Sequence, residues 1–337
     1  MITGARPPSR IGVVKPCCIG DCVMALPTLD SIAAAFPEAE LLLFVGNHSR
    51  PILESRGDRW QIRTIPDRIA PTAAARLALD TRAARVDLIV LLERSRLLHA
   101  ALDMLASASV APVAVVQPET RHESVAYLDV LRGLAIEPSV TRPMLSPSPA
   151  EEEAARQLLA RWARPVILHP GGAENPGATM PDKRWPADRY AELARWLDAE
   201  GYDVIFTGGR GDRDLVERII ADARLPADRS QAGEVDLRMA AALAARAQVV
   251  VAGDTGMSHI AAAAAAPVVA IFGPTNPRRY QPLGDAVTVL APDASWTLPD
   301  MDLRHTAGAS LPSTAEVSLD AVIAACRAAL GKWIVTT

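Results

Sequence analysis

Short runs of apolar residues recur along the whole chain, and each is separated from the next by a longer stretch with helical spacing. The runs occupy residues 11–14, 41–45, 86–92 and 113–116 in the first half, and 166–168, 204–207, 249–252, 268–272 and 287–290 in the second. Apolar runs that do not alternate with polar residues are typical of strands buried on both faces, as in parallel sheets covered by helices. We therefore predict that each half folds as a doubly wound α/β unit.

The chain length predicts two domains rather than one, because 337 residues exceed what a single hydrophobic core usually serves. Residues 143–149, P-M-L-S-P-S-P, precede an acidic helix start at 151–153, which is typical of a linker followed by a new helix. We place the boundary there, with an N-terminal domain over 1–146 and a C-terminal domain over 147–337 that closes with a helix near 317–330. The expected architecture has a central cleft between the two domains.

The charge and hydropathy of the chain argue against nucleic-acid binding and against membrane insertion. The net charge is -4, the isoelectric point is near 5.9, and the sequence has no dense run of Lys or Arg. The longest apolar stretch, 260–272, is interrupted by Pro267 and falls short of the roughly 20 residues that span a bilayer. Lys15 and Pro16 interrupt the first apolar run before it resembles a signal-peptide core. We expect a cytoplasmic monomer with at most peripheral membrane contact.

Four cysteines occur, and three of them, Cys17, Cys18 and Cys22, are clustered near the N-terminus. Zinc would need a fourth ligand with suitable spacing, and the nearest histidine is His48. We therefore expect no metal site and interpret the cysteines, including Cys326, as the reduced thiols of a cytosolic protein.

The first of four candidate motifs is K-P-C-C-I-G-D-C at 15–22, which follows the first predicted strand and leads into a helix predicted over 23–36. Asp21 is thereby expected at a helix start, on the edge of the sheet where ligands bind. Two interpretations stay open. The carboxylate either stabilises the helix dipole, which is worth about 0.3–1 kcal/mol, or has a function.

The second motif is H-P-G-G at 169–172, which closes the first strand of the second half and is followed by K-R-W-P at 183–186. Glycines such as Gly171 let the backbone approach a phosphate closely. Only three of the 35 basic residues are lysines, so Lys183 is a compact cation in a chain that otherwise uses arginine. We interpret Lys183 as a diphosphate ligand, with an exposed surface lysine as the alternative.

The third motif is T-G-G-R-G-D at 207–212, and it precedes a helix predicted to begin near Asp214. In the functional interpretation, Gly208 and Gly209 admit a nucleotide and Asp212 binds a ribose hydroxyl. A single glycine-rich turn is weak evidence. The alternative is a tight strand-to-helix connection with Asp212 as a cap.

The fourth motif, G-D-T-G-M-S-H, follows a predicted strand, ends at His259 and leads into a helix predicted over 260–266. Thr255 and Gly256 would place free N–H groups at the positive end of that helix, which favours anion binding. Asp254 as a buried cap and His259 as a packing histidine are the alternatives.

Together the motifs resemble the heptosyltransferase family, glycosyltransferase family 9, over nearly the whole chain. The family's N-terminal pattern has a basic residue, two small hydroxyl residues, I-G-D and a downstream A-L-P, and it is matched by Lys15, Cys17, Cys18, Ile19, Gly20, Asp21, Ala25, Leu26 and Pro27. The family's P-G, K-x-W-P, G-G and D-T-G-x-x-H elements are matched by residues 170–171, 183–186, 208–209 and 254–259. The chain departs from the family in having Cys17 and Cys18 for serines, Lys15 for arginine and Asp212 for glutamate.

The resemblance implies a GT-B fold of two Rossmann-like domains, with a nucleotide-sugar donor, most often ADP-heptose, on the second domain and the acceptor on the first. Domain closure would join them. The implied donor-binding residues are Lys183, Gly171, Gly208, Gly209, Asp212, Asp254, Thr255, Gly256 and His259. Lys183 and the helix end at Thr255 and Gly256 would stabilise the leaving diphosphate, so neither a metal nor another cofactor is expected.

On the acceptor side, the resemblance implies that Asp21 takes the proton of the acceptor hydroxyl during an inverting displacement with no covalent intermediate. Lys15, Cys18 and Gly20 are the implied acceptor-binding residues. A carbohydrate-containing acceptor is expected, as in lipopolysaccharide core assembly. Because residues 1–160 carry about equal numbers of basic and acidic side chains, a soluble acceptor such as a secondary metabolite stays open.

Three other functions fit an α/β chain. A nicotinamide-dependent dehydrogenase would show G-x-G-x-x-G after the first strand, where this chain has a single glycine, Gly20. A nucleotide-sugar epimerase and a non-catalytic nucleotide-sugar binding protein share the expected architecture, and both stay open.

Overall fold

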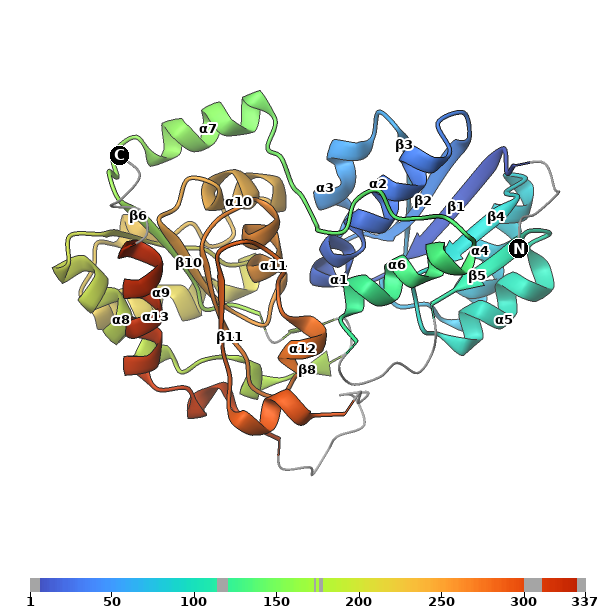
Figure 1. The fold of residues 1–337 in the computed structure, drawn as a ribbon. Helices are drawn as coiled ribbons and strands as arrows, with labels where there is room; N and C mark the ends of the chain where they lie inside the picture. The colour runs from blue at the N-terminus through green and yellow to red at the C-terminus, as the bar shows by residue number, and fades with distance from the viewer. Residues whose placement is uncertain (1–6, 114–120, 173, 176–177, 300–310, 332–337) are drawn as a thin grey trace. The chain divides into compact units, whose positions relative to one another are not determined.

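A computed structural model describes residues 7–113, 121–172, 174–175, 178–299 and 311–331. The chain divides into two compact units, Met1–Pro143 and Met144–Thr337, and each has its own five-stranded sheet (Figure 1). The division falls inside the proline-rich segment 143–149. The prediction of two parallel-sheet α/β units is confirmed.

The sheet of the first unit is parallel throughout and has the strand order β3-β2-β1-β4-β5. The strands are β1 (Arg10–Lys15), β2 (Glu40–Gly46), β3 (Trp60–Ile65), β4 (Leu88–Leu91) and β5 (Ser109–Pro112). The helices are α1 (Ile19–Met24), α2 (Leu26–Ala35), α3 (Arg50–Leu53), α4 (Pro71–Ala83), α5 (Arg96–Leu105) and α6 (Glu123–Gly133). The central strands are buried because helices cover both faces, whereas β3 and β5 at the sheet edges are partly exposed.

The sheet of the second unit has the order β12-β11-β10-β6-β9, again parallel. Its strands are β6 (Pro165–His169), β9 (Asp203–Phe206), β10 (Val249–Gly253), β11 (Val268–Ile271) and β12 (Val287–Leu290), and β7 (Glu174–Asn175) pairs separately with β8 (Ala178–Thr179). The helices are α7 (Pro149–Leu159), α8 (Ala187–Ala199), α9 (Arg213–Ala223), α10 (Leu237–Ala244), α11 (Gly256–Ala263), α12 (Pro277–Tyr280) and α13 (Leu319–Gly331).

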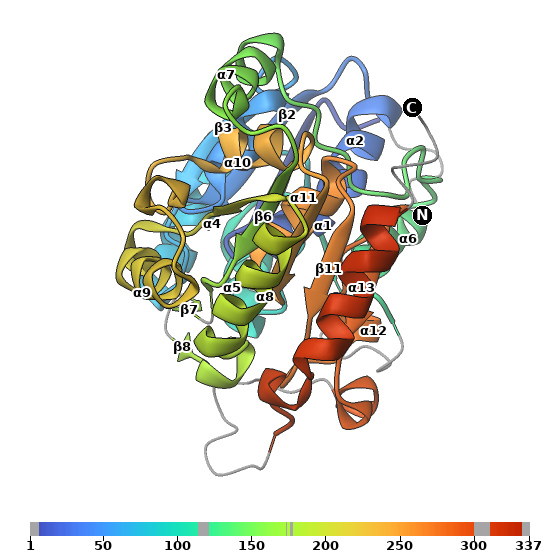
Figure 2. The same ribbon diagram turned by 90° about the vertical axis from the view of Figure 1, so that its left-hand side faces the viewer.

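Two separate apolar clusters cover the faces of this second sheet. Helices α8, α9 and α13 supply one cluster, and α7, α10 and α11 supply the other. Figure 2 shows α8 and α13 side by side on the same face, and Cys326 of α13 is fully buried there. The second sheet is therefore screened from water on both faces, and its ligand-accessible groups lie at its edges.

Local sequence explains where the second unit begins. Ser148 precedes α7, Pro149 is its first residue, and Glu151 is its third. The Ser148 hydroxyl accepts from the Glu151 N–H at 3.3 Å, and the Glu151 carboxylate accepts from the Ser148 N–H at 2.7 Å. This reciprocal capping box satisfies two N–H groups that a helix end would otherwise leave unpaired.

The edge strand β3 was not among the predicted strands, and three predicted elements differ from the structure or lie partly outside its described residues. The helix predicted over 23–36 is two helices, because α1 begins at Ile19 and α2 begins at Leu26. The strand predicted over 113–116 lies outside the described residues except for Val113, which directly follows β5, a strand that ends at Pro112. The helix predicted over 260–266 begins earlier, at Gly256. The other predicted strands are confirmed within two residues of their bounds.

Candidate functional site

All four motifs lie at the carboxyl ends of strands. In the first unit, β1 neighbours both β2 and β4, so the chain reverses its direction across the sheet between β1 and β4. In the second unit the same reversal occurs between β6 and β10. Ligands of open α/β sheets bind at such switch points, outside the carboxyl ends of the strands. Each unit therefore offers one candidate site.

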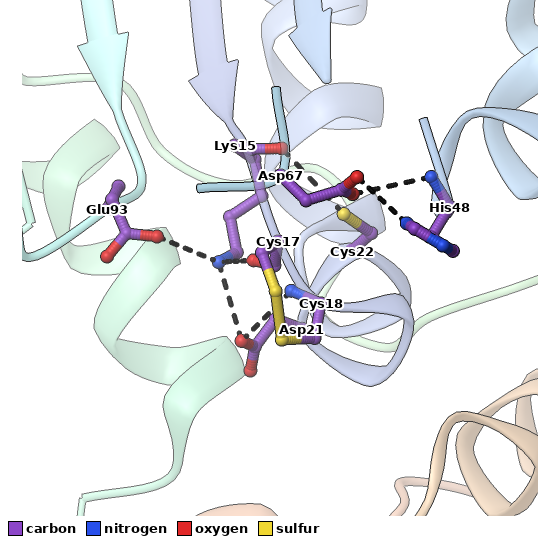
Figure 3. Close-up of a disulfide and its surroundings, with 8 residues drawn as sticks. All are labelled: Lys15, Cys17, Cys18, Asp21, Cys22, His48, Asp67 and Glu93. Atoms are coloured by element: carbon purple, nitrogen blue, oxygen red, sulfur yellow. Dashed lines mark hydrogen bonds and ion pairs between the residues drawn. A yellow bond between two sulfur atoms is a disulfide. The ribbon is translucent and has the colours of Figure 1, made fainter. Parts of the chain in front are cut away.

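The site of the first unit is built around a buried ammonium. Lys15 is the last residue of β1, and its side chain is only 5% exposed. Its Nζ lies 3.4 Å from Asp21 Oδ2 and donates to the carbonyl oxygen of Cys17 (Figure 3). Asp21 is the third residue of α1, and its side chain is 29% exposed. A carboxylate held by a buried cation thus stays accessible to another molecule.

Asp21 also makes the contact that a helix cap would make. Its Oδ2 accepts from the Cys18 N–H at 3.4 Å, as in a capping box. The bond is long compared with the usual 2.9–3.0 Å, so the cap contributes little. The structure therefore gives Asp21 both a weak cap contact and an ion pair with Lys15.

The pKa values at this site follow from burial and from neighbouring carboxylates. Burial raises the pKa of Asp21, attraction to Lys15 opposes the rise, and repulsion from Glu123 and Glu93 adds to it, so that the pKa is raised. Burial by itself would lower the pKa of Lys15, but attraction to these carboxylates outweighs it and raises that pKa instead. Asp21 is consequently a stronger base than an ordinary aspartate, and Lys15 stays protonated.

Glu93 belongs to the same cluster and was not among the predicted site residues. It follows β4 by two residues, and its Oε2 lies 3.6 Å from Lys15 Nζ (Figure 3). The pairing of Val14 with Leu91 brings β1 and β4 together and so places the two side chains near each other. No local motif marks Glu93, and only the strand order would have indicated it.

The expectation that Cys17 and Cys18 are reduced is wrong in this structure, where they form a disulfide (Figure 3). The expectation was based on the reducing conditions of the cytosol. It did not consider that Cys17 and Cys18 are adjacent in the turn after β1, where their sulfur atoms lie within bonding reach. Cys22 and Cys326 are free, as expected, and the structure shows that both are buried. Burial raises the pKa of Cys22 to about 11, so it is a neutral thiol.

The turn that carries the disulfide is supported from β2. A Cβ added to Gly46, the last residue of β2, would lie 2.0 Å from the carbonyl oxygen of Pro16 and 2.3 Å from Asp67 Oδ1. Asp67 in turn contacts His48, with 2.8 Å between Oδ2 and Nδ1. Only a residue without a side chain fits at position 46, which fixes the turn after Lys15 against its neighbour.

The site of the second unit is centred on Lys183 and Asp254. Lys183 Nζ lies 2.7 Å from Asp254 Oδ2, and the two side chains are 10% and 11% exposed. Thr275 Oγ1 donates to the same oxygen at 2.7 Å. The alternative of an exposed surface lysine is therefore wrong. Burial alone would raise the pKa of Asp254, but Lys183 and the hydroxyl of Thr275 lower it, so the Asp254 carboxylate is ionised.

The N-terminus of α11 lies directly after Asp254. Thr255 precedes the helix in extended conformation, and Gly256 is the first helical residue. The Thr255 Oγ1 is buried without a hydrogen-bond partner among the described residues, while the Ser258 hydroxyl donates to the Thr255 carbonyl at 2.8 Å. His259, in the first turn, is 4% exposed. The helix end thus offers N–H groups and an unpaired hydroxyl beside the Lys183 pair.

The predicted glycines of the loops after β6 and β9 pack against the Asp212 side chain; they do not line an open space. A Cβ on Gly171 would lie 2.3 Å from Asp212 Oδ2, and one on Gly208 would lie 2.9 Å from Asp212 Cβ. Asp212 Oδ2 accepts from the Gly209 N–H at 2.8 Å, and Oδ1 lies 3.4 Å from Arg184 Nη2. The predicted alternative, Asp212 as a cap, describes these contacts, and the predicted ribose role stays a prediction.

His169 closes β6 beside this loop. Its Nδ1 lies 3.0 Å from Thr207 Oγ1, and burial lowers its pKa to about 4, so the imidazole is neutral at pH 7. Gly172, three residues on, has a φ of +95°, and a Cβ there would lie 2.3 Å from Thr255 Cγ2. The loops after β6 and β10 are thus in contact, as the predicted donor site requires.

The predicted residues fall into two groups, one in each unit. The acceptor-side residues lie at the end of β1, in the turn that follows it and in the first turn of α1: Lys15, Cys18, Gly20 and Asp21. The predicted donor residues lie at the carboxyl edge of the second sheet. No three His, Cys, Asp or Glu side chains within the described part of the chain are grouped so that they could hold a metal ion. Nor does any described helix combine the length and the apolar character needed to cross a membrane.

Residues 134–308, slightly more than half of the chain, match the family model of glycosyltransferase family 9 (heptosyltransferase). The chain belongs to glycosyltransferase family 9. It is 35% identical over 161 residues to the lipooligosaccharide heptosyltransferase 2 of Haemophilus influenzae and 36% identical over 152 residues to the lipopolysaccharide heptosyltransferase 2 of Escherichia coli. These matches cover 45% and 44% of this family 9 chain and 45% and 42% of the relatives, so less than half of either relative is matched.

Solved structures share the fold over nearly the full length. A family 9 glycosyltransferase from Veillonella parvula superposes with a TM-score of 0.77 at 19% identity, covering 96% of this chain and 97% of that one. The ADP-heptose lipopolysaccharide heptosyltransferase II of E. coli gives 0.73 at 23% identity, covering 96% and 99%. An E. coli heptosyltransferase solved with ADP gives 0.67 at 18% identity, covering 95% and 99%. The predicted GT-B fold is confirmed.

Proposed function

We propose that this family 9 protein is an inverting, metal-independent glycosyltransferase that moves heptose from ADP-heptose to a hydroxyl of a lipopolysaccharide core acceptor. The observation that carries the proposal is the pair formed by Lys15 and Asp21 at the switch point of the first sheet, where a basic carboxylate is accessible and a buried cation holds it. The names of the relatives, which are heptosyltransferases of lipopolysaccharide and lipooligosaccharide, support the choice of sugar and acceptor.

The reaction divides between the two sites. Asp21 accepts the proton of the acceptor hydroxyl as that oxygen attacks the anomeric carbon of the donor, and the bond from that carbon to the diphosphate breaks in the same displacement. The departing electron pair stays on the diphosphate. Because attack and departure take place on opposite faces of the sugar, the anomeric configuration inverts. The raised pKa of Asp21 brings the base closer to the operating pH, which favours proton transfer.

The donor side supplies positive charge where the diphosphate develops negative charge. The Lys183 ammonium donates to Asp254 and retains further N–H groups for a phosphate oxygen. The N-terminus of α11 presents backbone N–H groups at Thr255 and Gly256, next to that ammonium. Support for ADP as the leaving group comes from the related fold that was solved with ADP.

Incubation with ADP-heptose and a panel of acceptors tests the proposal. The panel contains heptose-deficient lipopolysaccharide core and soluble saccharides, and mass spectrometry of the products detects transfer. We expect heptose on the lipopolysaccharide core and an inverted anomeric centre by NMR. Transfer to soluble saccharides only would reassign the acceptor. Epimerised donor without transfer, or donor binding without any product, would overturn the proposal.

Asp21→Asn sharpens the same test. Loss of a general base typically lowers the rate by about 10²–10⁴-fold, while the affinity for ADP should stay nearly unchanged, because Asp21 lies in the first unit and the donor residues lie in the second. Steady-state kinetics and calorimetry with ADP measure the two effects. A mutant with the wild-type kcat would reduce Asp21 to a helix cap.

A further inference from the structure

The cluster of charged side chains around Asp21 contains more carboxylates than cations. Lys15 is the cation of the turn after β1, and Glu93 and Asp21 both lie within 4 Å of its Nζ, at 3.6 and 3.4 Å. One ammonium therefore serves two carboxylates. Lys15 and Asp21 belong to one segment of the chain, and Glu93 reaches them because β1 and β4 are neighbours.

The other charged or titratable groups facing Asp21 come from α6, from α1 and from the segment after β4. Glu123 of α6 is 2% exposed and forms a two-toothed pair with Arg94, with distances of 2.6 and 2.8 Å, so it has a cation of its own, although its charge still repels Asp21. Tyr127, also of α6, has its ring 6.0 Å from Lys15 Nζ, and burial raises its pKa far above neutrality. Cys22 of α1 is a neutral thiol. The cluster retains one carboxylate in excess of its cations.

We propose that Glu93 is a positioning residue for the base: it occupies one side of the Lys15 ammonium, leaves Asp21 only a share of that cation, and so keeps the Asp21 carboxylate basic. Glu93 has its own anchor, because its Oε1 accepts from the Arg94 N–H at 3.0 Å. That bond holds the carboxylate facing Lys15. The inference rests on the proposed function of Asp21 as the base.

The physical consequence is a change in the basicity of Asp21 when the charge of Glu93 is removed. A neutral group at position 93 leaves Lys15 to Asp21 alone and also removes a repelling carboxylate. Both changes favour the ionised form of Asp21 and lower its pKa. A less basic carboxylate accepts a proton less readily, so the enzyme would stay active at lower pH but would turn over more slowly.

Glu93→Gln tests this with two measurements. The acidic limb of kcat/KM against pH should move to lower pH by about 0.5–1 unit, and kcat on the plateau should fall about two- to threefold. Glu93→Asp, which keeps the charge, should move the limb less. Independently of turnover, in protein labelled with ¹³C at aspartate carboxyls, the resonance that is missing in Asp21→Asn should titrate at lower pH in Glu93→Gln.

The matched control is Glu40→Gln. Glu40 is the first residue of β2 and so lies at the amino ends of the strands, whereas the site lies at their carboxyl ends. It is paired with Arg10, and its side chain is 35% exposed compared with 30% for Glu93. Its removal should leave the pH profile and the Asp21 resonance unchanged.

Two outcomes overturn the inference. A raised KM with an unmoved limb would make Glu93 an acceptor ligand, and a lower unfolding midpoint with an unmoved limb and resonance would make it purely structural. The proposed function is overturned by a different result, namely an Asp21→Asn variant that keeps the wild-type kcat. In that case the carboxyl titration still reports whether Glu93 changes the basicity of Asp21.

Discussion

Lys15 and Lys183 have the same physical situation in the two units. Each is a buried ammonium beside a carboxylate: Lys15 is the last residue of β1 and lies beside Asp21, and Lys183 ends a short 3-10 turn and lies beside Asp254. Arginine is far more frequent in this chain, but a guanidinium is planar, bulky and suited to two-toothed contacts. A compact ammonium can pair with one carboxylate and still donate to a second group, which is what both sites require.

Lys183→Ala should weaken ADP binding and turnover by about 10- to 100-fold, the equivalent of one charge-assisted hydrogen bond of about 1.5–3 kcal/mol. Lys183→Arg should restore only part of this, because the guanidinium must also fit between Asp254 and the diphosphate. Calorimetry with ADP and steady-state kinetics measure both variants.

The control for Lys183 is Arg195→Ala, which removes a positive charge from the exposed face of α8 in the same unit. It should leave ADP affinity unchanged. Lys183→Ala also leaves the buried Asp254 carboxylate without its cation, which should lower the stability of the protein. The measurements are therefore made at a temperature well below the unfolding midpoint of the variant. Wild-type ADP affinity in Lys183→Ala would remove the main cation from the proposed donor site.

At the scale of the elements, the loop after β6 and the loop after β9 interlock through Gly171 and Asp212. Gly171→Ala would drive a methyl group to within 2.3 Å of the Asp212 carboxylate and displace it from the Gly209 N–H. We expect a cost of about 1–3 kcal/mol in unfolding free energy, as for other overpacked sites.

A double-mutant cycle separates this explanation from a direct role of Gly171 in ligand binding. In an Asp212→Ala background the obstructing atoms are gone, so the added methyl group at position 171 should cost little. Urea unfolding of the four proteins gives the coupling free energy. Equal costs of Gly171→Ala in both backgrounds would show that Asp212 is not the reason for the glycine.

The same interlocking shows what sequence can predict and what it cannot. Buried strands such as β1, β6 and β10 are uninterrupted apolar runs, and the motifs follow them directly, so both were predictable. By contrast β3, W-Q-I-R-T-I, is a partly exposed edge strand whose polar residues hide it. Gly171 was predicted to approach a phosphate and Gly208 to admit a nucleotide, and in the structure both also make room for Asp212, a contact between loops that no single motif records.

Glu93 and the partners of Asp254 illustrate the same limit for the site. Glu93 follows β4, with no glycine or repeated motif beside it, and reaches Lys15 only through the pairing of strands. Thr275 comes after β11 and still donates to Asp254 after β10. Sequence indicates candidate loops for the site, whereas the contacts between loops depend on the order of strands in each sheet.

At the scale of the whole molecule, the two units share the α/β class but differ in the order of the strands in their sheets. The first sheet has the order β3-β2-β1-β4-β5, which leaves the first strand of the unit in the centre next to the second and fourth. The second sheet places its first strand, β6, between its second and third, β9 and β10. The two halves are therefore not copies of one another, and each switch point has its own set of side chains. The first carries an excess carboxylate, and the second carries an ammonium beside a helix N-terminus.

This division of charge leads to the last prediction, that the complete enzyme transfers heptose equally well in the presence and absence of EDTA. A divalent metal in a glycosyl transfer would neutralise the charge that develops on the diphosphate and would need carboxylate ligands to hold it. In the second unit the Lys183 ammonium and the N-terminus of α11 already supply positive charge at that place, and the Asp254 oxygen nearest to it is engaged by Lys183 and Thr275 at 2.7 Å each. A metal would have to compete with an ion pair that is almost fully buried. The measurement is the initial rate after extensive chelation, with metal content checked by mass spectrometry and with Mg²⁺ or Mn²⁺ added back. Loss of activity that either ion restores would contradict the assignment of this charge to Lys183 and the helix end.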